Sequence, residues 1–199
     1  MPSQRDTTIL PALTIHPLTS ERWPDLEALF GVRGACGGCW CMWWRLRQKE
    51  WDLQKGEANK AAFRGIVTSG PPPGLLAYVD GEPAAWCQIT PRSGVPRLTR
   101  APKMPPANDL ELWAISCFFV AKIYRRRGLS VKLIEAAVAF AKQHGADAVD
   151  GYPLEPKKGA SPDAFAWTGL AAAFRAAGFE EISRRSPTRP SMRYHLHRH

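Results

Sequence analysis

A basic turn between an apolar segment and an amphipathic segment constrains the fold of this chain more than any other feature. Leu110 to Val120 is apolar enough for a buried strand, and the turn Arg125 to Gly128 follows it closely. Beyond Gly128 the apolar residues recur at helical spacings as far as Gly145, where a helix is expected to end. Ala146 to Tyr152 then has the pattern of a second strand. The segment therefore predicts a strand, a turn, a helix and a strand in succession.

The remaining segments predict a mixed order of strands and helices. Leu75 to Val79 and Ala84 to Thr90 flank Asp80-Gly81, a dipeptide that tolerates the positive φ angles of a tight hairpin turn. Pro91 to Pro106 is rich in proline, arginine and lysine, which favours a surface loop. Periodicity and stop signals further predict strands at Leu13 to Pro17, Phe179 to Arg185 and Met192 to Leu196, and helices at Trp23 to Phe30, Met42 to Leu53, Asn59 to Val67 and Phe165 to Ala177.

This order indicates an α+β (mixed α/β) fold class. We expect one central twisted sheet that is mostly antiparallel and contains a parallel strand-helix-strand unit. A single domain is expected over residues 13–196, after a loosely ordered N-terminus over residues 1–12. The length of 199 residues suits one domain, and 45% hydrophobic against 23% charged residues is typical of a globular chain.

Charge and cysteine content narrow the class of function. The chain contains no apolar run near the roughly 20 residues of a bilayer span, and Met1 to Thr8 has no apolar signal core. We therefore expect a cytoplasmic protein with no membrane partner. Five cysteines, an odd count, are expected to be reduced thiols in that compartment. The net charge of +9 favours an anionic partner, whether nucleic acid, an acidic membrane surface or a polyphosphate ligand.

The basic turn has the chemistry of an anion-binding site. The first N–H groups of a helix have no helical partner and lie at the positive end of the helix dipole. Gly128 lets the backbone approach an anion closely, and the three arginines before it add charge at the rim. An arginine-rich tripeptide alone would more often be a solvated cap on a helix. The strand before the turn and the helix and strand after it favour a site for a diphosphate.

Here a family resemblance carries the interpretation further. Residues 119–130, FVAKIYRRRGLS, resemble the signature of the GNAT superfamily of N-acetyltransferases, whose CoA-binding turn has the pattern Gln/Arg-x-x-Gly-x-Gly/Ala. Arg125 and Gly128 match this pattern, and Ser130 is a small-residue variant of its last position. The order of elements agrees from Leu13 to Leu196, so the resemblance covers nearly the whole chain and implies a GNAT-like single domain.

The resemblance implies acetyl-CoA as the co-substrate, and we expect no metal. It implies that the N–H of Phe118 donates a hydrogen bond to the acetyl carbonyl and that Val120 pairs with pantetheine as an extra strand would. A donor aimed at the thioester oxygen would stabilise the charge that develops when an amine attacks the carbonyl carbon. The residues expected to bind the co-substrate are Phe118, Phe119, Val120, Arg125, Arg126, Arg127, Gly128, Leu129 and Ser130.

The groups that move protons depart from the family pattern. The tyrosine that commonly serves as the acid is replaced by Phe174, which has no proton to donate. A frequent asparagine of the same region is replaced by Trp167, and relatives carry glutamate or histidine where this chain has Ala114 and Ser116.

Two other residues are candidates for the missing acid and base. Glu111 is the carboxylate nearest to the expected strand positions, and it is a candidate base that would act directly or through water. Strand alternation would point it to the opposite face unless a bulge intervenes. Tyr152 ends the strand beside the expected cleft and is a candidate acid. The alternatives are a solvated carboxylate at a strand start and an amphipathic tyrosine at the rim.

A cysteine-rich segment precedes this region. Cys36 and Cys39 have the Cys-x-x-Cys spacing of a zinc knuckle, and Cys41 adds a third thiol. A closed zinc site needs four ligands, and no second Cys-x-x-Cys or His-x-x-x-His pair is present. We therefore expect a glycine-rich loop with small buried thiols. The alternative is a metal site completed by a distant cysteine or histidine.

Tryptophans crowd the same segment. By resemblance, this region forms the acceptor side of the cleft, where Trp40, Trp43 and Trp44 could bind an aromatic or cationic substrate. The alternative is that these residues, with Trp51, belong to the core, since their spacings include those of a helix.

The sequence thus predicts an acyl-CoA-dependent N-acetyltransferase that transfers an acetyl group directly to a primary amine of a small molecule or protein. We expect a monomer or homodimer. One alternative is a CoA-binding regulator without catalysis, which Phe174 suggests. Another is a basic nucleic-acid-binding module that uses the net charge and the segment Arg92 to Lys103, although nucleic acid is the less expected partner.

Overall fold

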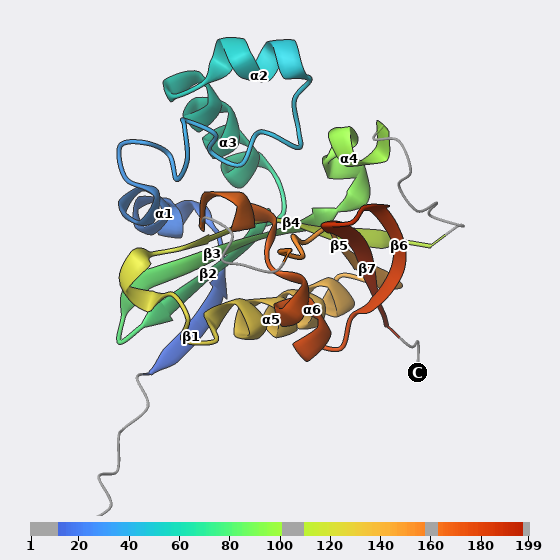
Figure 1. Ribbon diagram of the computed structural model, residues 1–199. Coiled ribbons are helices and arrows are strands. Elements are labelled where there is room, and N and C mark those ends of the chain that lie inside the picture. The colour runs from blue at the N-terminus through green and yellow to red at the C-terminus, as the bar shows by residue number, and fades with distance from the viewer. Residues whose placement is uncertain (1–11, 101–109, 158–162, 197–199) are drawn as a thin grey trace, which may run out of the picture.

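One seven-stranded sheet organises the molecule, in the order β1-β2-β3-β4-β5-β7-β6. The computed structural model describes residues 12–100, 110–157 and 163–196 (Figure 1). All neighbouring strands are antiparallel except β4 and β5, which run parallel. The strands are β1 (Leu13–Pro17), β2 (Gly74–Val79), β3 (Glu82–Pro91), β4 (Leu112–Val120), β5 (Ala148–Gly151), β6 (Glu180–Ser186) and β7 (Arg189–His195). The predicted mostly antiparallel sheet with a parallel pair is confirmed.

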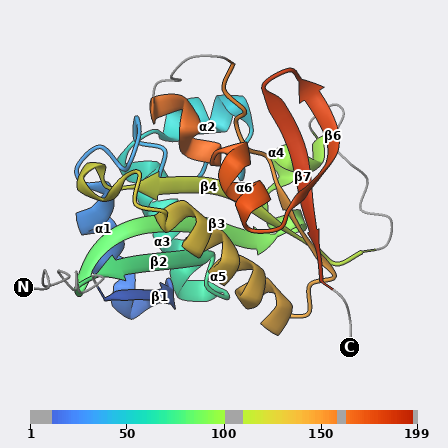
Figure 2. The same ribbon diagram turned by 60° about the horizontal axis from the view of Figure 1, so that its bottom comes forward.

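Helices cover both faces of this sheet. The α-helices are α1 (Trp23–Phe30), α2 (Gln48–Gln54), α3 (Glu57–Ser69), α4 (Pro96–Arg100), α5 (Leu129–Gln143) and α6 (Ala171–Ala176). Short 3₁₀ segments are η1 (Ser20–Arg22), η2 (Arg92–Gly94), η3 (Lys122–Tyr124) and η4 (Asp163–Thr168). Figures 1 and 2 show α5 and α6 on one face and α1, α2 and α3 on the other. We call these the α5 face and the α1 face. Among the helices described, none is long and apolar enough to cross a membrane.

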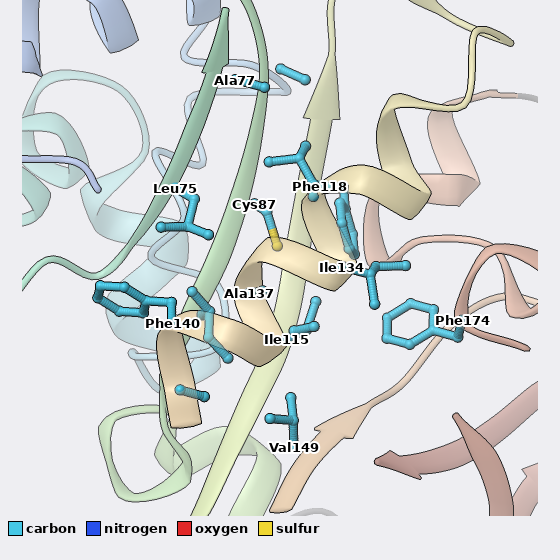
Figure 3. Close-up of a cluster of buried hydrophobic side chains, with 14 of the residues drawn as sticks. Leu75, Ala77, Cys87, Ile115, Phe118, Ile134, Ala137, Phe140, Val149 and Phe174 are labelled. Carbon is cyan, nitrogen blue, oxygen red and sulfur yellow. The ribbon is translucent and has the colours of Figure 1, made fainter. Parts of the chain in front are cut away.

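The core under α5 follows directly from the sequence pattern. Leu133, Ile134 and Ala137 lie on one side of the helix and are fully buried against the sheet. They meet inward-facing strand residues such as Ile115 and Val149 (Figure 3). Burial of this apolar stripe, about 25 cal/mol per Å², holds α5 in place across β2, β3 and β4. The start of α5 is thereby fixed beside the end of β4.

The hairpin between β2 and β3 forms where the Asp-Gly pair predicts it. Asp80 and Gly81 adopt φ angles of 51° and 86°, the left-handed values that such a turn requires. Asp80 also accepts a hydrogen bond from the backbone N–H of Ala12 at 2.9 Å. The turn therefore also anchors the chain just before β1.

Three predicted segments differ from the structure. The predicted loop Pro91 to Pro106 contains η2 and α4 as far as residue 100, because Val95 and Leu98 are fully buried and anchor it. Its part over residues 101–106 lies outside the described residues. The predicted helix from Met42 begins only at Gln48, after turns in which Trp40 and Cys41 have φ angles of 45° and 56°. The predicted helix over Phe165 to Ala177 is interrupted after η4.

A glycine causes this interruption. Gly169 has a φ angle of +84°, and a Cβ atom there would lie 2.8 Å from Phe174 and 2.9 Å from Phe118. The left-handed backbone ends η4, and the missing side chain lets both aromatic rings pack against the main chain. The break thus sets the distance between α6 and β4.

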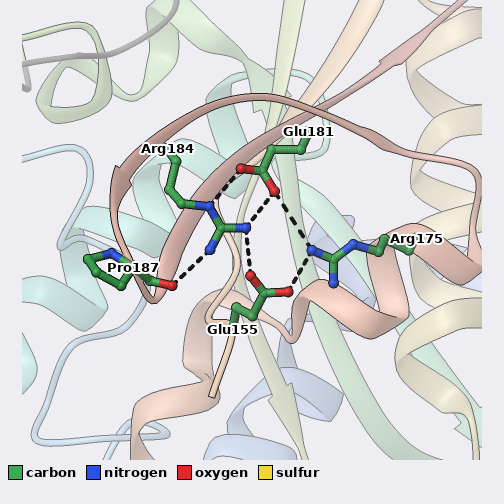
Figure 4. Close-up of polar contacts among 5 residues, drawn as sticks. All are labelled: Glu155, Arg175, Glu181, Arg184 and Pro187. Carbon is green, nitrogen blue, oxygen red and sulfur yellow. Dashed lines mark hydrogen bonds and ion pairs between the residues drawn. The ribbon is translucent and has the colours of Figure 1, made fainter. Parts of the chain in front are cut away.

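An exposed ion-pair network ties α6 to the last hairpin. Arg184 donates to Glu181 and to the carbonyl of Pro187, and it also pairs with Glu155 at 2.6 Å (Figure 4). Arg175 of α6 reaches Glu155 at 2.6 Å. Hydrogen bonds from the two arginines hold the pKa of Glu155 below its usual value. The network keeps β6 against α6, although solvent screens each pair.

Candidate active site

The parallel strands β4 and β5 separate in the middle of the sheet. They pair from Leu112 with Ala148 to Ile115 with Gly151, where β5 ends. The strand β4 continues to Val120, and over this last part its described strand partner is β3 alone. One backbone edge of residues 116–120 is therefore available to an extended ligand, which can pair with a strand edge as another strand would.

The start of α5 lies next to this edge. Gly128 is the N-cap residue in a left-handed conformation, with a φ angle of 79°, and no side chain caps the helix. The carbonyl of Gly128 accepts the N–H groups of Val131 and Lys132. The N–H groups of Leu129 and Ser130 precede the first intrahelical donors and are directed outward at the positive helix end. These groups are suited to hold an anion.

The arginines before Gly128 connect the turn to the strand. Arg125 donates through Nε to the carbonyl of Val120 at 2.9 Å, so its side chain spans the corner between β4 and η3. Arg126 has a positive φ angle of 60°, and the guanidinium of Arg127 lies 6.0 Å from the ring centre of Tyr124. The structure thus brings the predicted co-substrate residues, 118–120 and 125–130, to one end of the sheet.

A β-bulge in β4 lies at the point where the strands separate. Gln88 pairs with Cys117 and Ile89 pairs with Ile115, which leaves Ser116 as the extra residue. The carbonyl of Ser116 accepts a 2.8 Å hydrogen bond from the indole of Trp44. Because the bulge shifts the alternation by one residue, Ala114 and Cys117 both pack on the α1 face. Such bulges re-aim side chains next to active sites.

A cavity of about 400 Å³ opens on the α1 face beside the end of β4. Its wall combines the glycine- and cysteine-rich loop, the end of β4 and residues of α2 and η4. The lining residues are Ala35, Cys36, Gly37, Cys39, Cys41, Trp43, Trp51, Cys117, Phe118, Phe119 and Trp167. Since Phe118 and Phe119 belong to this wall, the cavity meets the same strand whose edge is available to an extended ligand.

Thiols contribute to the wall of the cavity. The Sγ atoms of Cys41 and Cys117 lie 3.8 Å apart, and the indole N–H of Trp86 donates to Cys41 at 3.1 Å. Burial raises the pKa of the Cys39 thiol to about 11. The hydrogen bond with Cys41, followed by burial, raises the pKa of Cys117 as well. All five cysteines are free, and Cys39 and Cys117 are neutral at physiological pH.

Three tryptophans also line the cavity. Trp43 meets Trp51 edge to face at 4.8 Å and lies 6.5 Å from Trp167 between ring centres. The guanidinium of Arg97 lies 3.8 Å from the ring centre of Trp43, and the Lys55 ammonium lies 4.2 Å from that of Trp51. The cavity is therefore aromatic inside and carries cations on its outer wall.

Of the tryptophans predicted to contact substrate, only Trp43 lines the cavity. Trp40 is buried and stacks on Trp23 at 5.9 Å in the α1-face core. Trp44 is 7% exposed, and its indole N–H donates a hydrogen bond to the carbonyl of Ser116. Both belong to the core, as the alternative held. Trp51 and Trp167 were not among the predicted substrate residues, because only the tertiary structure brings α2 and η4 to the same wall.

The structure separates Glu111 from this site. Glu111 lies before the first residue of β4, is exposed, and pairs through its backbone with Asp147. Phe118 is seven residues further along, which corresponds to about 23 Å of extended strand. The bulge at Ser116 changes which face a side chain takes and shortens this span only by about one residue's rise, so Glu111 still lies far from Phe118. The position of Glu111 therefore does not support its predicted role as a base, and favours the solvated carboxylate.

Tyr152 is buried rather than placed at a rim. It is 1% exposed and packs with Trp44, and its hydroxyl lies 3.3 Å from Oδ2 of Asp150. Arg193 binds Asp150 with two donors at 2.6 and 3.0 Å, and Arg92 approaches it at 3.4 Å. Burial first, and then the Asp150 carboxylate, raise the pKa of Tyr152. Its buried position and its hydrogen bond do not support the predicted role of an acid that reaches a ligand.

Phe174 is likewise fully buried. Its ring meets Phe118 perpendicularly at 6.0 Å and Phe179 at 5.0 Å between centres. A Cβ atom on Gly151 would lie 2.1 Å from this ring, so the end of β5 is shaped around it. Phe174, at the position of the family's tyrosine, thus packs beneath the point where β4 and β5 separate.

Comparisons with solved structures support the fold. Polyamine N-acetyltransferase of Drosophila melanogaster superposes with a TM-score of 0.57 at 12% identity, covering 93% of this chain and 100% of that one. The yncA protein of Salmonella typhimurium, solved with acetyl-CoA, gives 0.52 at 13% identity, with 94% and 96% covered. The paia N-acetyltransferase of Thermoplasma acidophilum, solved with coenzyme A, gives 0.51 at 12% identity, with 93% and 99% covered. At these identities the likeness establishes the fold.

Sequence comparison establishes the family. A search of curated proteins found no match. The profile of the acetyltransferase (GNAT) family matches residues 40–151, more than half of the chain, and this range includes β4, the basic turn and α5. The chain therefore belongs to the GNAT family of acyl-CoA-dependent N-acetyltransferases.

Proposed function

We propose that the chain transfers an acetyl group from acetyl-CoA directly to a primary amine. The observation that carries the proposal is the available edge of β4 at residues 116–120 beside the uncapped start of α5. An extended pantetheine arm fits the first and a diphosphate fits the second. The yncA protein of similar fold was solved with acetyl-CoA.

The site residues have the following proposed roles. Phe118 supplies its N–H to the acetyl carbonyl, and Val120 pairs with pantetheine. The turn from Arg125 to Ser130 holds the diphosphate through backbone donors and arginine side chains. The cavity beside Phe118 and Phe119 receives the amine, so that its nitrogen can approach the carbonyl carbon from the α1 face.

Binding and turnover test this proposal in sequence. Calorimetry with acetyl-CoA is expected to show one site per chain with a dissociation constant below roughly 1 mM. Release of the CoA thiol in the presence of an amine library then reports turnover. Failure to bind acetyl-CoA in calorimetry would refute the proposal.

A CoA-binding regulator without catalysis is the second candidate. It is favoured by the buried phenyl ring of Phe174 and by the positions of Glu111 and Tyr152, which leave both predicted proton-transfer groups away from the cavity. This candidate predicts tight acetyl-CoA binding with no amine-dependent thiol release. For either candidate we place the protein in the cytoplasm as a monomer or homodimer without a nucleic-acid partner, which fractionation, light scattering and gel retardation would test.

A further inference from the structure

We propose that the acceptor is a weakly basic aromatic amine that binds the tryptophan cavity in its uncharged form. The inference rests on the proposed acetyl transfer and names the substrate class of that same site. It follows from three properties of the cavity: its aromatic and sulfur lining, the sign of the charges around it, and the chemistry of proton removal.

The lining favours a flat apolar ligand. Trp43, Trp51 and Trp167 present ring edges and faces, while the thiols of Cys39 and Cys41 supply soft, polarisable contacts. Aromatic rings stack or meet edge to face with tryptophan at favourable energy, and sulfur contacts ring edges well. The volume of about 400 Å³ is within the usual range for a small-molecule site. A single aromatic ring therefore fits this wall.

The charges disfavour a cationic acceptor. Among the described residues that line the cavity, none carries a carboxylate or an imidazole. Arg97 and Lys55 occupy one face each of Trp43 and Trp51, which places positive charge where an ammonium group would need negative charge. An ammonium group in such a site would lose hydration without gaining a counter-ion.

Two acidic side chains of α2, the helix that carries Trp51, are already engaged. On α2, Asp52 pairs with Lys55 at 3.1 Å and accepts from Gln48 at 2.8 Å. Glu50 accepts the backbone N–H of Arg47 at 2.9 Å, at the start of the same helix. Neither lines the cavity, so neither provides a counter-ion for an ammonium group inside it.

Proton removal leads to the same substrate class. In the transfer, the nitrogen lone pair forms the N–C bond, the C–S bond breaks, and its electron pair goes to the CoA sulfur. The nitrogen then loses one proton, and the CoA thiol carries one at the end, so the reaction is balanced without another reactant. An alkylamine must first lose a proton from its ammonium form, which calls for a base. An aromatic amine is already uncharged at neutral pH. It therefore needs no base in the described lining to remove an ammonium proton.

Paired substrates test the inference in the purified protein. With saturating acetyl-CoA at pH 7, we expect kcat/KM for an aniline to exceed that of the matching benzylamine by at least about tenfold, and spermidine to give no thiol release above background. The benzylamine rate should rise with pH along the ionisation of benzylamine itself, while the aniline rate stays flat between pH 6.5 and 8.5, roughly. A preference for spermidine or benzylamine at pH 7 would overturn the inference.

A charge placed at the mouth of the cavity tests the location. Cys36 is exposed and lines the cavity, so Cys36→Asp adds a carboxylate without disturbing the core. We expect the benzylamine-to-aniline ratio of kcat/KM to increase by about fivefold. Cys36→Asn has nearly the same shape without the charge, and the wild-type ratio is expected to persist. An unchanged ratio in Cys36→Asp would place the acceptor elsewhere and overturn the inference.

The failure of this inference is distinguishable from that of the proposed function. If the protein binds no acetyl-CoA in calorimetry, acetyl transfer itself is refuted, and this inference falls with it. If acetyl-CoA binds and alkylamines or polyamines are acetylated in preference to anilines, acetyl transfer stands and only the substrate class is wrong.

Discussion

The two sides of the candidate cleft are built in different ways. The co-substrate side is one continuous segment, from β4 through the basic turn into α5, and regular hydrogen bonding fixes its geometry. The acceptor side combines the irregular loop around Cys36 to Trp43 with residues from α2, β4 and η4. The first side therefore depends on local backbone conformation, and the second depends on the packing of distant segments. Changes to the two sides should consequently have different effects.

The largest expected effect is on the co-substrate side. Gly128→Glu adds a negative charge and a side chain at the left-handed N-cap of α5, and it should weaken acetyl-CoA binding roughly a thousandfold, about 4 kcal/mol. Gly145→Glu is the matched control, because Gly145 also has a positive φ angle and open space around it, at the other end of α5. Calorimetry should give the control a near wild-type dissociation constant. Equal losses in both variants would show that strain rather than the anion site is responsible.

The next effect concerns the buried support of the acceptor side. Asp150→Asn leaves the guanidinium groups of Arg193 and Arg92 without their buried carboxylate, so the free energy of unfolding should fall by about 3 kcal/mol. Glu181→Gln is the comparison in the exposed network of Figure 4, where the loss should stay below about 1 kcal/mol. Urea denaturation measures both. Similar losses in the two variants would contradict the distinction between buried and exposed pairs.

A smaller effect should isolate the acceptor side. Trp167→Ala removes one aromatic wall of the cavity, and KM for the acceptor should increase by about tenfold. The dissociation constant of acetyl-CoA should change less than about twofold, because Trp167 is not among the residues of the basic turn. Trp167→Phe keeps an aromatic face and should recover most of the loss. Steady-state kinetics with both substrates measures these changes. A parallel loss of acetyl-CoA affinity would mean that the two sides are not independent.

The smallest effect is the pH dependence of a cavity thiol. Burial raises the pKa of Cys39 from 9.0 to about 11, so its contribution to stability is complete below pH 9 and is lost as the pH rises towards 11. Between pH 8 and pH 10 the wild type should lose roughly 1 kcal/mol more unfolding free energy than Cys39→Ser. Urea denaturation at the two pH values measures this difference. Equal losses in both proteins would show that Cys39 is not desolvated.

Much of the fold was predictable because its signals are local. The predicted bounds of β1 and α1 agree with the structure, and the Asp80-Gly81 hairpin forms as expected. The predictions were wrong where burial or backbone conformation overrides composition. The basic, proline-rich segment after Pro91 contains α4, since Leu98 is buried, and η4 ends before Gly169. Neither outcome follows from periodicity alone.

The candidate site also has one part that local signals predict and another that depends on tertiary packing. The residues of the basic turn, Arg125 to Ser130, were identified from spacing and family resemblance, and the structure places them beside the open edge of β4. For the acceptor side, spacing could not tell Trp40 in the core from Trp43 at the cavity, because both lie in turns without a regular period. Glu111 was the nearest carboxylate in sequence, but the length of β4 separates it from Phe118.

The sequence by itself determined the strand, turn and helix that form the co-substrate side. Apolar alternation, helical period and the conformational freedom of Gly128 each act over a few residues, so the information is present in the segment itself. Only the tertiary structure decided what lines the cavity that is proposed to receive the amine. The bulge at Ser116 sets the phase of β4, and the packing of α2 and η4 brings Trp51 and Trp167 beside Trp43. These contacts join residues far apart in the chain, and their geometry depends on side-chain packing that no local pattern encodes.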